Sequence, residues 1–384
     1  MKKKYTLLIM GNLNDNHLLR FTKHLKACNP NIRMDYFGFC DRPDSVPDEN
    51  LKCFDCCCIN KTPILFHKIP VVRSLVTIIT WKLKFAQFIR NRSYDIANIH
   101  FITYHYYSII KRLRKCTGSI VLTPWGSDIY RIKDSERKIV RRIYDQADYV
   151  TGHGDRFSDD FMRIYHVDKS KFKNATLGSE TIDYIYDHFQ STSVKDAKKA
   201  LGIDYCYAIT CGYNASKAQR HKEMIEAIAK IKVQLPENMV LLFPLTYPKD
   251  KEYKEQIKKL VEYYGFKAKY YESYLDMDTL FMLRQATDMF IHIQTTDANN
   301  ASLKEYLLCK KKVVNGSWLK YYDVEEDNYK PYYIVDDLSE LPDVILKTFK
   351  EEPIEVKDNV IQAICSMGCR EVAKEWNKLF ESIS

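Results

Sequence analysis

The chain has 384 residues, of which 46% are hydrophobic and 28% are charged. Single hydrophobic cores stop growing at roughly 250 to 300 residues, so this length predicts two globular domains, and the apolar share excludes a disordered chain. No apolar run is long enough to span a membrane, and residues 1–10 are too short for a signal peptide, so we expect a cytoplasmic protein.

The net charge of +9 is unevenly distributed. Residues 1–185 carry 31 Lys and Arg against 19 Asp and Glu, whereas residues 186–384 carry 28 against 31. A basic half favours an anionic partner. Charge alone leaves nucleic acid, an anionic membrane surface and a phosphate-bearing substrate as alternatives.

Apolar segments alternate with helical patterns along the whole chain. In the first half, strands are predicted at 5–10, 94–101, 119–123 and 147–151, and helices after Gly11-Asn12, at 104–115 and at 134–146. After a polar stretch at 190–195, strands are predicted at 207–212, 239–244, 267–271, 289–293 and 312–315, with helices at 221–233, 251–264, 278–286, 302–309 and 358–382. Such alternation is typical of parallel sheets with helices on their faces.

The pattern predicts an α/β protein of two Rossmann-like domains. We expect an N-terminal domain over 1–185, a C-terminal domain over 186–357 and a last helix, within 358–384, that packs back toward the first domain. Domains that face each other in this way form a cleft at the carboxyl ends of both sheets, where such sheets bind ligands. No Gly-x-Gly-x-x-Gly or Gly-x4-Gly-Lys-Ser/Thr sequence follows a strand, which excludes dinucleotide oxidoreductases and P-loop nucleotidases.

The chain has 12 cysteines, including the run at 56–58. No second Cys or His pair lies at the spacing of a metal site, so we interpret these residues as reduced thiols and expect no metal.

Residues 295–308 carry the most informative motif. They follow a predicted strand and open a helix, so free backbone N–H groups and the positive helix end can bind a diphosphate. Asp297 and Glu305 enclose this turn and could accept hydrogen bonds from sugar hydroxyls. The alternative is that Ser302 and Glu305 form a capping box, which needs no ligand.

With this motif the chain resembles the two-domain GT-B glycosyltransferases, particularly glycosyltransferase family four. That family carries Glu-x7-Glu here, and Asp297-x7-Glu305 is the counterpart, with a first acid one methylene shorter. The resemblance implies that Glu305 binds the ribose hydroxyls of the donor. It also implies that Asp297, with the backbone of Asn299, Ser302 and Leu303, holds the donor sugar and phosphates.

The turn from Gly212 to His221 is similar to the family's second signature, in which cations follow a Gly-Arg turn. Cations suit this place because the leaving nucleoside diphosphate gains negative charge, and Lys217 and Arg220 are the candidates. Tyr213 stands where the family has arginine. The alternative is a solvated basic turn.

Asn214 in this turn, and Thr246 in the later Pro-Leu-Thr-Tyr-Pro segment, also resemble fucosamine-type (Fuc4NAc) transferases. Those enzymes invert stereochemistry and lack the paired acids, so Glu305 favours the retaining family.

In the first half, Thr123-Pro-Trp125-Gly126-Ser-Asp128 resembles the family's His-Gly-x-Asp turn, which faces the acceptor. The resemblance implies that Asp128 orients an acceptor hydroxyl and that Trp125 stacks on a sugar. The alternative is a helix N-cap at Ser127 or Asp128.

Three further residues follow predicted strands of this half. His153 could donate a hydrogen bond to the donor sugar, and Gly11 and Asn12 form the first-strand turn that approaches donor or acceptor in this fold.

Residues 66–92 mix apolar and aromatic side chains with Lys and Arg. This pattern suits an interfacial helix on an anionic membrane surface, and a second basic face runs from Arg131 to Arg142. The alternative is a core helix whose lysines reach out to solvent.

The expected function is therefore a nucleotide-sugar-dependent hexosyltransferase. It would move a sugar, with retention, from a nucleotide-sugar co-substrate to a surface polysaccharide or polyprenyl-diphosphate-linked glycan, without a metal or other cofactor. One alternative is a catalytically silent GT-B partner subunit. A nucleic-acid-binding protein is a weaker alternative, because the sequence has no recognised nucleic-acid motif.

Overall fold

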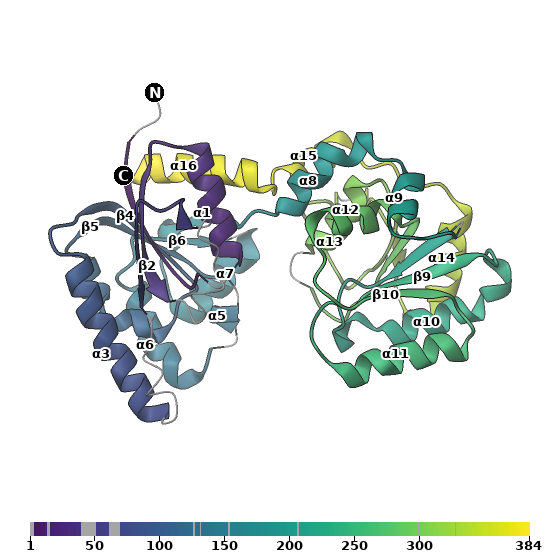
Figure 1. The fold of residues 1–384 in the computed structure, drawn as a ribbon, viewed down its shortest axis with the longest axis horizontal. Coiled ribbons are helices and arrows are strands. Elements are labelled where there is room, and N and C mark those ends of the chain that lie inside the picture. The colour runs from purple at the N-terminus through teal and green to yellow at the C-terminus, as the bar shows by residue number, and fades with distance from the viewer. Residues whose placement is uncertain are drawn as a thin grey trace. The chain divides into compact units, whose positions relative to one another are not determined.

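The computed structural model describes residues 4–13, 16–39, 51–60, 70–125, 127–130, 132–152, 154–205, 207–297, 300–326 and 328–384. The chain divides into two compact units. Unit 1 comprises Met1–Gly178 and Cys369–Ser384, and unit 2 comprises Ser179–Gly368. Each unit contains a parallel sheet covered by helices (Figure 1).

Unit 1 is built on a seven-stranded sheet in the order β3-β2-β1-β4-β5-β6-β7. Its strands are β1 (Thr6–Met10), β2 (Arg33–Phe39), β3 (Cys56–Asn60), β4 (Tyr94–His100), β5 (Thr117–Thr123), β6 (Tyr149–Gly152) and β7 (Phe172–Asn174). Its helices include α1 (Asn16–Cys28), α3 (Pro70–Phe88), α4 (Ile110–Leu113), α5 (Ser127–Tyr130), α6 (Asp134–Tyr144), α7 (Gly154–Tyr165) and α16 (Cys369–Ile383), with a 3₁₀ turn η3 (Tyr104–Ser108).

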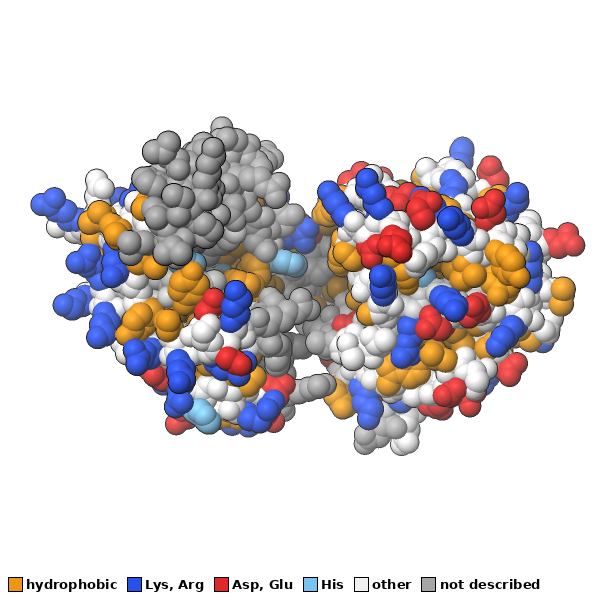
Figure 2. All heavy atoms as spheres, turned by 90° about the horizontal axis from the view of Figure 1, so that it is seen from below, with side chains coloured by type: hydrophobic (Ala, Val, Ile, Leu, Met, Phe, Trp, Pro, Cys, Tyr) orange, Lys and Arg blue, Asp and Glu red, His pale blue; other side chains and the backbone are white. Residues whose placement is uncertain are grey.

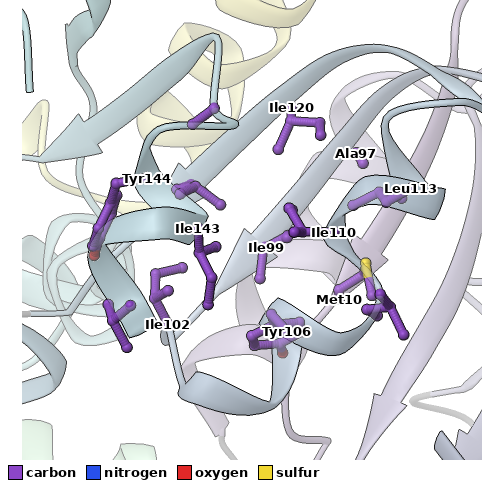
Figure 3. Close-up of a cluster of buried hydrophobic side chains, with 14 of the residues drawn as sticks. Met10, Ala97, Ile99, Ile102, Tyr106, Ile110, Leu113, Ile120, Ile143 and Tyr144 are labelled. Carbon is purple, nitrogen blue, oxygen red and sulfur yellow. The ribbon is translucent and has the colours of Figure 1, made fainter. Parts of the chain in front are cut away.

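Alternate side chains of β1 enter two different cores, because successive residues of a strand point to opposite faces. Leu7 and Ile9 pack with α1 and α16, whereas Leu8 and Met10 pack with α3, α4 and α6. Figure 3 shows part of the second core, with Met10 and Ile99 facing the side chains of η3, α4 and α6.

Unit 2 is built on a six-stranded sheet in the order β10-β9-β8-β11-β12-β13. Its strands are β8 (Tyr207–Cys211), β9 (Met239–Pro244), β10 (Ala268–Tyr271), β11 (Met289–His292), β12 (Lys312–Gly316) and β13 (Tyr333–Val335). Its helices are α8 (Glu180–His188), α9 (Val194–Ala200), α10 (His221–Lys230), α11 (Lys251–Tyr263), α12 (Met277–Ala286), α13 (Ala301–Leu308), α14 (Leu341–Lys350) and α15 (Asp358–Cys365).

The predicted parallel α/β architecture is confirmed, and three of the expected boundaries differ in the structure. The helix expected at 104–115 is divided into η3 and α4 by Ile109, whose backbone (φ −122°, ψ −14°) is not helical. The helix expected at 358–382 is likewise divided into α15 and α16, because Gly368 forms a bridge with Ser179. The units separate after Gly178 rather than after residue 185, because Ile182 and Ile185 of α8 pack into the core of unit 2.

The basic amphipathic stretch corresponds in its described part to α3. Trp81, Phe85 and Phe88 are buried in the core of unit 1, as expected for a core helix. Ile79 and Leu83 are 47% and 66% exposed, so an apolar side also remains at the surface. None of the described helices combines the length and the hydropathy needed to cross a membrane.

The cysteine run at 56–58 lies in β3. Cys56 and Cys58 pack against the core of unit 1, whereas Cys57, on the other face of the strand, is exposed. Side chains that alternate in this way cannot converge on one ion. In the described ranges all cysteines are free, and no group of three His, Cys, Asp or Glu is arranged to hold a metal.

Candidate functional site

The strand order of unit 2 creates a switch point between β8 and β11. The chain runs outward from β8 through β9 to β10 and then returns to β11 on the other side of β8. Ile291 pairs with Cys211 at the carboxyl ends of these two strands. Residues 212–220 and 293–297 therefore leave the sheet at one edge, where open α/β sheets bind ligands.

The turn after β8 has a backbone that requires glycine at its start. Gly212 has φ +66°, and an added Cβ would lie 2.8 Å from Gln219 Oε1. Asn214 is buried, and its Oδ1 accepts a hydrogen bond from the Ser216 backbone N–H over 2.8 Å. Gly212 and Asn214 therefore shape the turn through backbone conformation and an Asx-turn.

The two predicted cations of this turn differ in how firmly they are held. The Arg220 guanidinium carbon lies 5.1 Å from the centre of the Trp318 ring, and the residue is half-buried. Lys217 is 70% exposed, with its Nζ 3.5 Å from Asp250 Oδ2. An exposed ion pair contributes little, so Lys217 can leave Asp250 readily, whereas Arg220 has a fixed direction.

Thr246 lies in the neighbouring loop, two residues after the end of β9, and is half-buried. The two loops are joined by a hydrogen bond from the Ala215 backbone N–H to the Tyr247 carbonyl over 2.6 Å. The residues that the sequence grouped by resemblance to fucosamine-type transferases are thus adjacent in unit 2.

The carboxylate of Asp297 is held by neutral donors. Its Oδ2 accepts hydrogen bonds from Asn300 Nδ2 over 2.6 Å, from the Tyr321 hydroxyl over 3.1 Å and from Gln294 Nε2. His292 Nε2 lies 3.7 Å away, but burial lowers the pKa of His292 to about 4. The imidazole of His292 is therefore neutral near pH 7.

The N-cap of α13 is Asn300, whose Oδ1 accepts a hydrogen bond from the Leu303 backbone N–H over 2.8 Å. The capping box proposed for Ser302 and Glu305 is wrong, because Ser302 already lies inside the first helical turn. Its hydroxyl instead accepts a hydrogen bond from Arg284 over 3.2 Å. Leu303 is completely buried, and its backbone N–H is engaged by this cap.

Glu305 is buried and paired. Arg284 Nε donates to Glu305 Oε2 over 2.9 Å, and both side chains are nearly inaccessible to solvent. A buried carboxylate needs such a partner, because an unpaired charge in this place would be strongly destabilising.

Two glutamines that the sequence did not single out connect these loops. Gln294 Oε1 accepts hydrogen bonds from Gln219 Nε2 over 2.7 Å and from the Tyr213 hydroxyl over 3.2 Å. The Gln294 carbonyl accepts one from Trp318 Nε1 over 2.6 Å. Burial raises the pKa of Tyr213 to about 12, so this residue supplies a neutral hydroxyl where the family has a cation. Buried amides and tyrosines of this kind leave no periodic signal in a sequence.

The acceptor residues predicted for unit 1 lie at the carboxyl edge of its sheet. Asp128 is buried and accepts hydrogen bonds from the backbone N–H groups of Trp125 over 2.8 Å and Ile102 over 2.7 Å. Asp128 is not the N-cap residue, because α5 begins at Ser127, and both of these donors precede the helix. Asp128 therefore joins the loops after β4 and β5.

Trp125 is half-buried, with its ring 5.8 Å from His17 and 5.7 Å from Phe101. Gly11 follows β1, where an added Cβ would lie 2.7 Å from Leu18 Cδ2, and half-buried Asn12 comes next. Gly11, Asn12, Trp125 and Asp128 thus share one edge of unit 1. The predicted residues Gly126, His153 and Asn299 lie outside the described residues.

A family described as "Glycosyl transferase 4-like" matches residues 8–153 of the chain. No curated protein matches this chain. The match therefore covers most of unit 1.

Solved structures are similar over the whole chain. A glycosyltransferase from Rickettsia africae has a TM-score of 0.76 and 14% identity, with 99% of each chain covered. HepE of Anabaena in complex with UDP has a TM-score of 0.69 and 13% identity, with 99% of this chain and 100% of that chain covered. The lipopolysaccharide outer core galactosyltransferase WaaB, in its apo form, has a TM-score of 0.62 and 12% identity, with 99% of each chain covered. The predicted GT-B fold is confirmed.

Proposed function

The chain is a GT-B-fold protein similar to the glycosyltransferases of family four, and on that premise we propose that it transfers a sugar from a nucleotide-sugar donor. The observation that carries the proposal is that Arg220, Asp297 and Glu305 belong to the segments that follow β8 and β11 at the switch point of unit 2. Arg220 and Asp297 lie in the two loops, and Glu305 lies in α13. Acids that accept from hydroxyls and a cation for phosphate are the groups that such a donor requires.

The proposed chemistry assigns these groups separate tasks. The bond between the anomeric carbon and the donor phosphate breaks, and the nucleoside diphosphate leaves with the negative charge. Arg220, Lys217 and the backbone N–H groups at the start of α13 would stabilise that charge without a metal. Asp297 would accept hydrogen bonds from the donor sugar, and Glu305 from the ribose. In a retaining reaction, a donor phosphate oxygen takes the proton of the incoming acceptor hydroxyl on the same face.

The proposed acceptor is a surface polysaccharide or a polyprenyl-diphosphate-linked glycan, reached at an anionic membrane surface. The proposal is supported by the exposed Ile79 and Leu83 of α3, with the exposed Lys82 between them. It is also supported by the excess of Lys and Arg in residues 1–185, and such side chains are frequent over unit 1, on the left of Figure 2. Apolar side chains beside cations are the combination that anionic interfaces bind.

The donor is tested by a thermal-shift panel of UDP, GDP, dTDP, CMP and their common sugar conjugates, with EDTA present. A nucleotide that binds the folded state raises the melting temperature by linkage. We expect one nucleotide to stabilise the wild type and to stabilise Glu305→Gln less. If no nucleotide shifts the wild type, the chain is a silent GT-B partner. Transfer from the matching sugar nucleotide, with the anomeric configuration of the product read by NMR, tests retention.

The membrane part is tested separately by sedimentation with phosphatidylglycerol vesicles. We expect Leu83→Ser to weaken binding. Val233→Ser is the control, because Val233 is 95% exposed but lies in unit 2. Equal binding by both variants would contradict a role of α3.

A further inference from the structure

Arg284 of α12 is a buried cation that contacts three residues of α13. Its Nε donates to Glu305 Oε2 over 2.9 Å, its Nη1 to the Tyr306 hydroxyl over 2.9 Å and its Nη2 to Ser302 Oγ over 3.2 Å. Its guanidinium carbon also lies 4.6 Å from the centre of the Tyr306 ring. All three guanidinium nitrogens therefore donate hydrogen bonds to one face of α13.

This face is defined by helical spacing. Ser302, Glu305 and Tyr306 are separated by three and four residues, so they lie side by side on α13. Tyr306 is fixed in turn, because its ring stacks on Phe290 of β11 with centroids 4.1 Å apart. Arg284 thus connects the first turns of α13 to a rigid part of the core of unit 2.

The contact between Arg284 and Glu305 is a buried ion pair. Burial opposes the charged guanidinium, but Tyr306 and Glu305 outweigh it and raise the pKa of Arg284, so Arg284 stays charged. Arg284 therefore places a fixed positive charge 2.9 Å from Glu305 Oε2. An ionised carboxylate accepts hydrogen bonds and cannot donate them.

Arg284 donates a hydrogen bond to one oxygen of the Glu305 carboxylate and not to the other. Arg284 occupies Oε2, and Oε1 accepts no hydrogen bond from any residue in the described ranges. We propose that Arg284 is a positioning residue that fixes the Glu305 carboxylate so that Oε1 accepts hydrogen bonds from the ribose hydroxyls of the donor nucleotide. This inference rests on the function proposed above. It makes the Arg284–Glu305 pair the determinant of selectivity for ribose over 2′-deoxyribose.

The test measures, by isothermal titration calorimetry, the affinity of the purified full chain for the nucleoside diphosphate found in the panel and for its 2′-deoxy analogue. We expect the wild type to prefer the ribonucleotide by about 10-fold or more, the usual effect of losing a hydrogen bond to a charged group. Arg284→Met and Glu305→Gln should weaken ribonucleotide binding and bring this ratio close to 1. Arg284→Lys, which keeps the charge but not the fork, should restore part of the ratio.

Lys198→Met is the matched control, because it breaks a different ion pair of unit 2, between Lys198 Nζ and Asp288 Oδ2 over 2.7 Å. It should lower the melting temperature and leave the ratio unchanged. If Arg284→Met does not fold, the comparison of Arg284→Lys with the wild type decides. A ratio that stays at the wild-type value in the Arg284 variants, while Glu305→Gln abolishes it, overturns the inference and leaves the proposed function intact. Failure of the wild type to bind any nucleotide overturns both.

Discussion

Tyr321 donates a hydrogen bond to Asp297 Oδ2 over 3.1 Å. The same hydroxyl lies 2.8 Å from His292 Nε2. Because the hydrogen of Tyr321 is directed to the carboxylate, His292 Nε2 must carry a proton and donate to the hydroxyl oxygen. The chain from β11 to Asp297 therefore consists of neutral groups that orient one carboxylate.

Tyr321→Phe removes the hydroxyl that links His292 to Asp297. We expect kcat/KM for the sugar nucleotide to fall about 10-fold, because Asp297 loses a donor and His292 is left without a partner at Nε2. Tyr332→Phe is the control, because Tyr332 is another buried tyrosine of unit 2 whose hydroxyl donates to a carboxylate, that of Glu325. Equal kcat/KM in the two variants, with equal loss of stability in urea, would contradict a role for Tyr321 at the site.

Gly212→Ala tests how much unfolding free energy is lost when a Cβ is added in the turn after β8. Gly212 and Gly265 both have φ +66°, so alanine should be strained by a similar amount in either place. At Gly212 the Cβ would also lie 2.8 Å from Gln219 Oε1, whereas at Gly265 the nearest atom, Lys232 Nζ, would be 3.3 Å away. We expect Gly265→Ala to lose about 1 kcal/mol of unfolding free energy and Gly212→Ala about 2 to 3 kcal/mol.

Nucleotide affinity separates the two glycine variants further. Gly212→Ala displaces Gln219, which donates to Gln294 beside Asp297, so its nucleotide affinity should fall. Gly265→Ala should bind like the wild type. If both variants lose the same unfolding free energy in urea, the contact between the added Cβ and Gln219 does not destabilise the Gly212 variant further.

The sequence predicted the strands that precede the candidate loops, and it singled out Asp297 before α13 and Glu305 within it as candidate donor-binding acids. Strands β8 and β11 are continuous apolar runs, which local pattern identifies. The N-cap of α13 could not be assigned from the local sequence pattern, because Asn300 and Ser302 are both good capping residues. Only the extended backbone of Asn300 (φ −84°, ψ 108°) decides between them.

Two of the residues that orient the acids, Arg284 and Tyr321, could not be predicted, because they reach the site from distant segments. Arg284 lies 21 positions before Glu305, and Tyr321 lies 24 positions after Asp297. Strand β2 was missed for a related reason, since it contains the buried Asp35. That carboxylate is tolerated there because Tyr94 donates to it over 2.9 Å and Arg33 lies 3.5 Å away. Tertiary partners make these polar residues acceptable, and a local pattern does not contain them.

Stability should fall below neutral pH because three histidines are buried in the neutral form. Burial lowers the pKa of His292 and of His221 to about 4, and that of His100 to about 3. The unfolded chain takes up protons near pH 6.5 and the folded chain does not, so the stability is lost as the pH falls from about 6.5 toward 4. Each histidine should contribute a slope of roughly 1.4 kcal/mol per pH unit.

His221 and His292 are buried in unit 2, whereas unit 1 has the buried His100 and the half-buried His105, whose pKa burial also lowers, so we expect a steeper slope in unit 2. Hydrogen exchange with mass spectrometry at pH 7, 6 and 5 reports each unit separately. His221→Gln should halve the slope of unit 2 and leave that of unit 1 unchanged. Equal slopes in the two units of the wild type would contradict this assignment.

Asp128→Asn tests whether the carboxylate in unit 1 serves the acceptor or only the fold. Asp128 accepts two backbone hydrogen bonds while buried, and an asparagine has one acceptor oxygen for both donors. We expect a loss of about 2 kcal/mol of unfolding free energy. The loop that carries Trp125 should shift, so KM for the acceptor should rise while KM for the donor stays unchanged. Asp148→Asn is the control, because Asp148 Oδ2 accepts from the Ile120 backbone over 2.7 Å at the start of β6, away from this loop. An acceptor KM that stays at the wild-type value in Asp128→Asn would mean that Asp128 only stabilises the fold of unit 1.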